Sequence, residues 1–524
     1  MPKDLTTAAN VPERKIGLAS AAAISISLMI GSGIFSTPSS VVFLVGSPIM
    51  ALIMYIIGGV FSLGGAFAFI ELGIMFPKNG GTLRYLAHSF GKPRALLSYL
   101  FAWSMMMCIR PGAIAANGPV FAKYWIYGIY DGTSYQTEHP NLYKNKDWTY
   151  RIIALFGITF ATLICMLSVK WSLRLINVLT VLKMTVLTII SVSGILVLAG
   201  AIKIPKNDNW SSGFKNTKSN LGGYASALNK VFFAYDGWSN LTYNIGELIN
   251  PSRNLPIAST IGISSVTVLY VFAIVAFYSV VPYDVALASN ETIAAEFTNR
   301  VFGSIVGRRI LPILIGLSVF GAVLSQIFAI GRIVSSAAEV GFIPKGKKLA
   351  SYNKRFKTPL YALAFNWVIT MIYLLAPPPG DVFDLLVDFV QYPTWFFYGL
   401  SALGCVYMRF KYPNYPLRKY KSFMPLTYVF ILVCVYLSVF PFIPFTKQSG
   451  AYPYYLSPTL GVVTIAAGIV PYYFRMYWYA NKTGNDYTAW IKEEEDELIA
   501  ENSLSNALDY GQSTGDSIIT SSLK

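Results

Sequence analysis

The chain has 524 residues, of which 54% are hydrophobic and only 13% are charged. Soluble globular domains carry about a quarter charged residues, so this composition excludes a water-soluble protein and predicts a polytopic membrane protein. The formal net charge of +16 does not indicate nucleic-acid binding, because the cations lie in loops between apolar segments, where they set orientation in a membrane.

About twelve apolar segments are long enough to cross a bilayer as helices, which takes about 20 residues each. The sequence therefore predicts an all-α integral membrane protein. The expected spans lie near 17–38, 48–76, 94–125, 152–169, 175–201, 222–246, 257–281, 302–336, 360–376, 383–408, 424–444 and 456–475.

Lysine and arginine residues gather in alternate loops. Lys78 and Arg84 follow the second span, Lys347 and Lys348 follow the eighth, and Arg418 follows the tenth. Cytoplasmic loops carry the excess of cations, so this pattern predicts that both termini lie in the cytoplasm.

The first expected span is interrupted by Gly31, Ser32 and Gly33. These are poor helix formers, and at mid-membrane depth a broken helix is tolerated only where its backbone lines a cavity. Free amide groups there would suit an anion such as a carboxylate. Close helix packing through small residues is the competing interpretation of the same motif.

The sixth expected span contains a second interruption, Asp236-Gly237, which is turn chemistry inside an apolar run. An unpaired carboxylate is costly in a membrane, so we expect Asp236 to face water, a ligand or a partner cation. Paired interruptions in two halves are typical of inverted-repeat transporters, whose substrate site lies between the breaks.

Several motifs together resemble one known family. Gly31 to Phe35 with Pro38 is similar to the first helix of the L-type amino acid transporters, within the amino acid–polyamine–organocation superfamily. Phe233 to Trp238 resembles that family's sixth helix, and Ile109-Arg110-Pro111 its third. The segment 375–381 is similar to the fungal high-affinity methionine permeases of the same group.

The resemblance implies a leucine-transporter-like fold, with a 5+5 inverted repeat, broken helices 1 and 6, and two extra C-terminal helices. The implied segments are a cytoplasmic tail (1–15), the first repeat (16–202), the second repeat (203–410), helices 11 and 12 (411–478), and a cytoplasmic acidic, Ser-rich disordered tail (479–524).

The resemblance also implies roles for single residues. Ser32 and Gly33 would bind the substrate carboxylate, carbonyl groups around Met29, Phe233 and Ala234 would bind its ammonium group, and Phe233 would act as an aromatic gate. Asn117, Tyr392 and Trp395 would line the side-chain pocket. Ordinary bundle packing remains open for the two aromatic residues, and an interhelical hydrogen bond for Asn117.

Lys183 is a lone cation in the fifth expected span. The resemblance places it beside the first break, where sodium-coupled relatives hold a sodium ion, so we expect sodium-independent transport. A shuttle for protons is a second expected role for it, whereas snorkelling to the membrane surface is the structural alternative.

Two features depart from the family pattern. A carboxylate, Asp236, stands where the family has a small residue, so Asp236 is a second candidate for proton coupling or for binding the substrate ammonium. The loop at about 126–150 lacks the cysteine that joins animal relatives to a partner glycoprotein. We therefore expect a stand-alone permease without a disulfide-linked heavy chain.

Other classes fit less well. His88 and His139 are the only histidines, they fall on opposite sides of the membrane, and no phosphate-binding glycine loop is present. We expect neither an enzyme nor a cofactor or metal site. Asp381, Asp384 and Asp388 resemble a carboxylate metal set, but no second cluster joins them.

We expect a permease that imports neutral amino acids, methionine or similar, through the plasma membrane by alternating access with proton coupling. An amino acid sensor, an exchanger of cationic or broad selectivity, and a vacuolar location stay open.

For the tail after residue 480, composition favours a solvated segment, and binding of trafficking or ubiquitination adaptors is the alternative. For Glu71, near the end of the second span, a solvated carboxylate is the simplest interpretation.

Overall fold

The structure, a computed structural model, describes residue 14 and residues 16–130, 139–205, 207–303, 305–343, 346–353, 355–378, 380, 382–444 and 452–500. Within these ranges the chain is built of helices, and its one β-bridge joins Ile16 to Leu248. Asp381, most of the 1–15 tail and residues 501–524 lie outside the described part.

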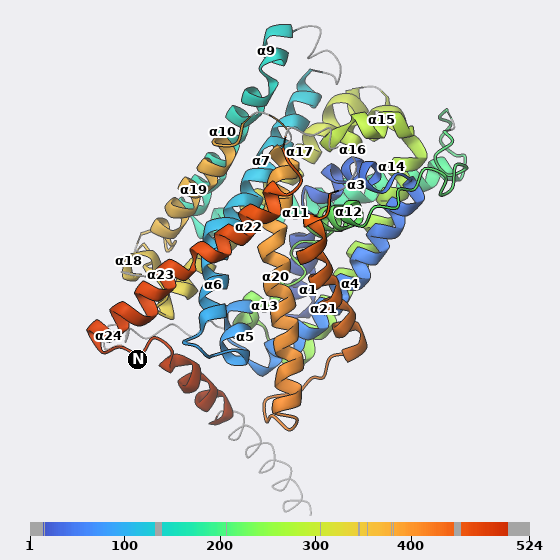
Figure 1. Cartoon of the computed structure of the whole chain (residues 1–524). Coiled ribbons are helices and arrows are strands. Elements are labelled where there is room, and N and C mark those ends of the chain that lie inside the picture. Colours follow the sequence, from blue (N-terminus) through green and yellow to red (C-terminus); the bar gives the residue numbers. More distant parts are fainter. Residues whose placement is uncertain are drawn as a thin grey trace, which may run out of the picture.

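The described residues of the first part of the chain form the following α-helices (Figure 1). They are α1 (Leu18–Met29), α2 (Gly33–Ser36), α3 (Pro38–Val45), α4 (Pro48–Met75), α5 (Thr82–Ser89), α6 (Leu96–Ser104), α7 (Arg110–Ile129), α9 (Pro140–Lys144), α10 (Lys146–Leu167) and α11 (Val169–Leu198). A π-helical turn, η1 (Met105–Ile109), joins α6 to α7.

The labelled helices of the second part follow, and a further helix at 489–500 is described below. They are α12 (Leu221–Ala234), α13 (Asn240–Tyr243), α14 (Pro251–Val280), α15 (Tyr283–Ala288), α16 (Ile293–Phe302), α17 (Leu311–Glu339), α18 (Lys347–Ala350), α19 (Leu360–Leu375), α20 (Val382–Lys411), α21 (Met424–Val439), α22 (Leu456–Ala467), α23 (Ile469–Tyr473) and α24 (Ala480–Thr483). Short π or 3₁₀ turns are η2 (Ile245–Glu247), η3 (Asn290–Thr292), η4 (Val306–Ile310), η5 (Phe440–Phe442) and η6 (Phe474–Tyr479).

Eight helical stretches of the described chain are long and apolar enough to cross a membrane. They make this a multi-pass membrane protein. The other four expected spans coincide with α6–α7, α12–α13, α19 and α20, which are interrupted, short or polar. The total of twelve therefore stays a prediction.

Large apolar side chains cover the outside of the bundle. Phe156, Val181 and Leu432 are each 68% exposed. In water such a surface would favour aggregation, whereas in lipid it is the expected exterior.

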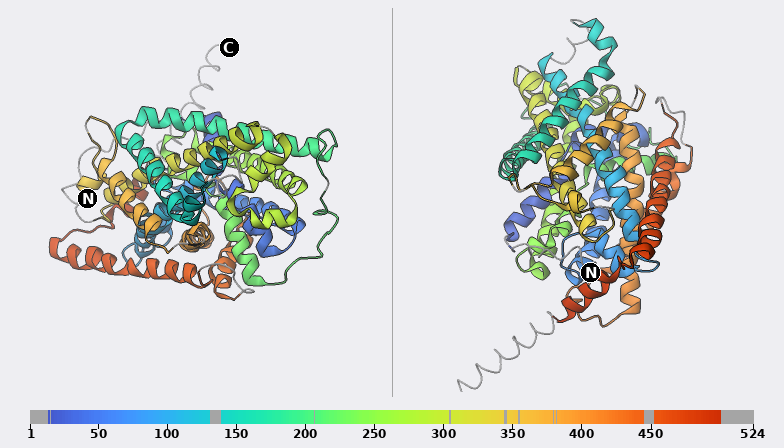
Figure 2. Two further views of the ribbon diagram at one scale, coloured as in Figure 1. Left: turned by 90° about the horizontal axis from the view of Figure 1, so that it is seen from above. Right: turned by 90° about the vertical axis from the view of Figure 1, so that its left-hand side faces the viewer.

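The two broken helices lie inside the bundle. α1 packs against α14, and α12 packs against α3, α4 and α20. α7 and α17 pack closely on each other beside them. The helices α22, α23 and α24 run obliquely along one side of the bundle, away from this centre (Figures 1 and 2).

The bundle has two ends, which we name after helices that lie there: the α9 end, with α15 and α16, and the α5 end, with α18 and α24 (Figure 1). Residues 489–500 form a helix at the α5 end, although we expected a solvated, disordered tail from residue 479 onward. Their acidic side chains bind cations at this end: Glu494, which is 6% exposed, pairs with Arg84 of α5, and Glu497 pairs with Lys78 of the loop between α4 and α5. No local pattern indicates this docking, because the basic partners lie some 400 residues earlier in the chain.

Candidate functional site

The first break separates α1 from α2. α1 ends at Met29, and α2 begins at Gly33. The backbone N–H groups of Gly31, Ser32 and Gly33 donate no backbone hydrogen bond within the described residues. These amides are therefore free to bind a ligand.

The second break separates α12 from α13 and lies directly against the first. A Cβ atom on Gly33 would be 2.3 Å from the Cα of Ala234, and one on Gly237 would be 2.7 Å from the carbonyl carbon of Leu28. Gly237 also has a φ of +113°, which side chains rarely permit. Glycine at both positions allows the two broken backbones to touch.

Tyr270 of α14 connects the two breaks. Its hydroxyl lies 2.9 Å from the carbonyl oxygen of Met29 and 2.9 Å from that of Ala234. The hydroxyl carries one hydrogen, so it can fully satisfy only one of these carbonyls at a time. An acceptor thus stays available at the breaks.

Lys183 of α11 lies behind the first break. Its side chain is 1% exposed, and its ammonium group donates a hydrogen bond to the carbonyl oxygen of Ser27 in the last turn of α1. The lysine does not snorkel to the surface but holds the end of the broken helix.

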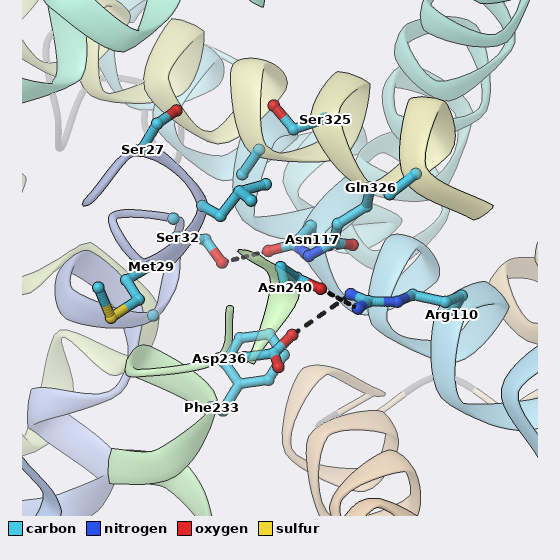
Figure 3. Close-up of a pocket in the computed structure, with 15 residues that line it drawn as sticks. Ser27, Met29, Ser32, Arg110, Asn117, Phe233, Asp236, Asn240, Ser325 and Gln326 are labelled. Atoms are coloured by element: carbon cyan, nitrogen blue, oxygen red, sulfur yellow. Dashed lines mark hydrogen bonds and ion pairs between the residues drawn. The ribbon is translucent and has the colours of Figure 1, made fainter. Parts of the chain in front are cut away.

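A cavity of about 500 Å³, including the solvent at its mouth, lies where the breaks meet α7 and α17 (Figure 3). The lining residues of α17 recur three or four positions apart and so share one helix face. The lining comprises Ser27, Leu28, Met29, Gly31, Ser32, Gly33, Arg110, Asn117, Phe233, Asp236, Asn240, Ala322, Ser325, Gln326 and Ala329.

Polar side chains from three helices meet on one side of this cavity. The Ser32 hydroxyl donates to the Asn117 side-chain oxygen. The Asn117 amide nitrogen donates to the carbonyl oxygen of Ala113 at 2.8 Å and lies 3.5 Å from the Gln326 side-chain oxygen. Asn117 therefore lines the cavity. It also makes an interhelical contact, which we had considered as the alternative to a role in the substrate pocket.

Asp236 faces a partner cation that we did not select from the sequence. Its carboxylate lies 3.6 Å from the guanidinium of Arg110, which also donates to the Asn240 side-chain oxygen at 2.9 Å (Figure 3). Arg110 is 2% exposed, and the Asp236 side chain is 26% exposed. An arginine inside an expected span was a usable signal, because intramembrane charges mark functional sites. The π turn η1, which ends at Ile109, is a second signal.

Six of the expected substrate-binding residues line the cavity: Met29, Ser32, Gly33, Asn117, Phe233 and Asp236. Ala234 packs behind Gly33 and is 1% exposed. Phe233 meets Phe383 edge to face, with the ring centroids 5.8 Å apart.

Tyr392 and Trp395 of α20 do not line this cavity. Tyr392 faces a second, smaller cavity, and Trp395 packs against Phe232 and Phe430 with ring centroids 4.1 and 5.8 Å away. Which side chains of α20 face the central cavity depends on the rotation of the helix about its axis, and side-chain packing sets that rotation. Neither residue therefore lines the central cavity in this structure, and a role for them in the side-chain pocket stays a prediction.

The arrangement suits a small zwitterion. Free amides from the first break and carbonyl oxygens from both breaks lie around one cavity, together with neutral polar groups and one ion pair. Such a site can bind a carboxylate and an ammonium group at once without a fully desolvated, unpaired charge.

Residues 16–466 match the family described as amino acid permease. The chain is 32% identical to the b(0,+)-type amino acid transporter 1 of Mus musculus over 469 residues, which are 89% of this chain and 88% of that protein. It is 30% identical to the high-affinity methionine permease of Saccharomyces cerevisiae, over 85% of this chain and 76% of the permease. It is also 30% identical to the cystine/glutamate transporter of Homo sapiens, over 89% and 86%.

The chain therefore belongs to the amino acid permease family, as its first- and sixth-helix motifs indicated. Its relatives agree with the L-type group of the amino acid–polyamine–organocation superfamily.

Proposed function

We propose that this protein is a secondary active permease that imports neutral amino acids, methionine or similar, by alternating access. The observation that carries the proposal is the cavity at the contact between two broken helices, with unbonded amides on one side and carbonyl acceptors beside them.

In this proposal the amides of Ser32 and Gly33 bind the substrate carboxylate. The carbonyl groups of Met29, Phe233 and Ala234 bind the ammonium group, and Phe233 closes the cavity over the substrate. Asn117 contacts the substrate side chain. We assign no direct contact to Tyr392 and Trp395, because they lie outside the cavity.

Substrate selectivity is the least constrained part of the proposal. The relative named as a methionine permease favours a neutral substrate. The Arg110–Asp236 pair in the cavity wall favours the alternative, an exchanger of cationic or broader selectivity, since either charge could engage a charged side chain. A sensor with little transport is the third candidate.

We propose Lys183 as a coupling residue, with transport independent of sodium, because its ammonium group holds the Ser27 carbonyl where a bound cation would otherwise act. Asp236 is the second coupling candidate, since its carboxylate faces the cavity. Proton coupling through either group requires that it exchange a proton during the transport cycle.

The remaining parts of the proposal concern arrangement. We propose two inverted repeats (16–202 and 203–410) followed by helices at 411–478, with both termini in the cytoplasm and the α9 end outside. We place the protein in the plasma membrane, with the vacuole as the alternative. We propose that it is not an enzyme and acts without a disulfide-linked heavy chain. Its four cysteines are all buried free thiols.

The test is uptake of labelled methionine by the purified full chain in proteoliposomes, with and without an inward proton gradient and with sodium replaced by choline. We expect gradient-driven accumulation that needs no sodium and that unlabelled neutral amino acids inhibit. Binding without flux would favour the sensor, and counterflow without any effect of the gradient would favour the exchanger.

A matched pair of lysine variants tests the coupling. Lys183→Met should abolish the response to the proton gradient. Lys123→Met, which removes an α7 lysine paired with Glu291 at 2.6 Å, should leave it unchanged. An intact gradient response in Lys183→Met would exclude Lys183 as the coupling residue.

A further inference from the structure

A second cavity lies between α12, α20, η5 and the first turn of α22. Its volume is about 250 Å³, including the solvent at its mouth. Its polar wall contains Ser226, Asn229, Asp388, Tyr392 and Tyr454, and Pro441 and Pro458 form an apolar wall. It shares no lining residue with the central cavity.

The polar wall presents acceptors that lack donors. Asn229 is 3% exposed, and its side-chain oxygen receives no hydrogen bond. The Oδ1 atom of Asp388 is likewise shielded from solvent and accepts no hydrogen bond, although the Lys230 ammonium group lies 3.7 Å from it. A buried acceptor left without a donor is destabilising, so native proteins keep such groups rarely and often for a ligand.

The charges in this region do not balance among the described residues. The Lys230 ammonium group, on an α12 side chain that is 4% exposed, lies 2.8 Å from Asp384 and 3.7 Å from Asp388. Asp384 also accepts a hydrogen bond from Ser40 of α3 at 3.4 Å. One ammonium group thus serves two carboxylates, and its closer contact is with Asp384.

We propose that this cavity binds the primary ammonium group of an amino acid on the outer side of the membrane, before the amino acid reaches the central cavity. The inference rests on the proposed function and orientation, which place the α9 end outside. An ammonium group brings three hydrogen-bond donors and one positive charge. The Asn229 oxygen, the Asp388 oxygen and the Ser226 hydroxyl can accept those hydrogens.

The composition of the wall selects this ligand over a divalent metal ion. Calcium takes six to eight oxygen ligands, often from several carboxylates, whereas Asp388 is the one carboxylate among the residues that line this cavity. The proline wall gives an aliphatic or thioether side chain an apolar surface. The Phe233–Phe383 contact and the Ser40–Asp384–Lys230 contacts link α3, α12 and α20.

The first experiment measures binding by isothermal titration calorimetry on the detergent-solubilised full chain. The probe is n-propylammonium chloride, which has the ammonium group but no carboxylate, with sodium chloride as the inorganic comparison. We expect binding of n-propylammonium to the wild type, with at least about tenfold weaker binding to Asp388→Asn and Asn229→Leu. Absence of binding to the wild type, or equal binding of sodium, would overturn the inference whatever the transport assay shows.

The second experiment measures sidedness in oriented proteoliposomes. Asp388→Asn should raise the half-saturating methionine concentration for influx about tenfold and leave that for efflux unchanged. Glu291→Gln, which removes a negative charge elsewhere near the α9 end, should change neither. Equal effects of Asp388→Asn on influx and efflux would contradict an outer station. Should the wild type carry no amino acid, the proposed function fails, while the calorimetry still decides whether the ammonium site exists.

Asn229→Ser is a second variant for the case in which leucine disturbs folding. It keeps a short acceptor, so we expect an affinity between those of the wild type and Asn229→Leu. Thermal melting of each variant controls for loss of fold. If Asn229→Ser and a folded Asn229→Leu bind n-propylammonium with equal affinity, the Asn229 oxygen does not contribute to the site.

Discussion

Buried carboxylates occur at both ends of the bundle, but their surroundings differ. At the α5 end, Glu71 of α4 is 0% exposed and accepts hydrogen bonds from Arg409 at 2.5 and 2.9 Å. It also accepts bonds from the Ser422 amide at 2.9 Å and the Ser422 hydroxyl at 3.0 Å, and pairs with Arg418 at 3.0 Å. At the α9 end, the Oδ1 atom of Asp388 lies 3.7 Å from the Lys230 ammonium group, which is closer to Asp384, and accepts no hydrogen bond.

The comparison separates two uses of the same chemical group. Glu71 has its acceptor capacity filled by three residues that come from α20 and the chain after it. A carboxylate satisfied in this way joins α4 to that segment and has little capacity left for a ligand. Asp388, beside an equally unbonded Asn229, has capacity left. The number of donors around a buried carboxylate thus distinguishes a structural clamp from a candidate binding site.

The largest effect should come from Glu71. Glu71→Gln would leave two guanidinium groups without their carboxylate, which should lower the free energy of unfolding by about 3 kcal/mol or more. Asp388→Asn, by contrast, should change stability by less than about 1 kcal/mol. Thermal melting of the two variants in the same detergent gives the measurement. Similar melting temperatures would remove the distinction between clamp and site.

Lys183 is an intermediate case, a fully buried cation with one backbone acceptor, the Ser27 carbonyl. Lys183→Met removes that bond at the end of α1, and we expect methionine uptake to fall about tenfold or more. Lys183→Arg keeps the positive charge but has a larger side chain. Partial methionine uptake by this variant would show that the charge contributes to transport. Full uptake by the methionine variant would show that the bond is dispensable.

Asp236 tests the central cavity. Asp236→Asn removes the carboxylate 3.6 Å from Arg110 and leaves that guanidinium with Asn240. The uncompensated cation should attract anionic substrates, so inhibition of methionine uptake by glutamate should strengthen about fivefold. The measurement is inhibition of methionine uptake by glutamate, compared with inhibition by leucine. If Asp236→Asn changes neither, the Arg110–Asp236 pair has a structural role only.

The smallest effect should come from the docked C-terminal helix. His88 lies in α5, outside the spans, and burial together with the charges of Arg84 and Lys78 lowers the pKa of His88 to about 3. Its 3.4 Å contact with Glu494 is therefore a hydrogen bond of the neutral imidazole, and Arg84 supplies the charge partner of Glu494.

Because its pKa is lowered in the fold, His88 takes up a proton more readily after unfolding. Stability should fall as the pH drops below about 6.5 and continue to fall towards the folded value, by about 1 kcal/mol between pH 7 and 5.5. Thermal melting across this range, compared with His88→Asn, checks the prediction. An equal slope in the variant would assign the pH dependence to other groups.

Much of the candidate site could be predicted from the sequence, because its defining features are local. Gly31, Ser32 and Gly33 break a helix wherever the chain places them, and Asp236-Gly237 does the same. The free amides and the contact between the two breaks follow from these residues. The role of Arg110 did not follow, because its partners Asp236 and Asn240 come from a distant span.

Hydrophobic length and helix-breaking chemistry by themselves determined that this is a helical membrane protein with two interrupted helices, since both properties act within about 20 residues of chain. Tertiary structure alone decided which side chains share a cavity. It placed Tyr392 and Trp395 outside the central cavity, buried Glu71 under Arg409, and docked residues 489–500 on Lys78 and on Arg84 of α5. Each of these outcomes depends on the rotation and crossing of helices far apart in sequence, which packing sets and no local pattern encodes.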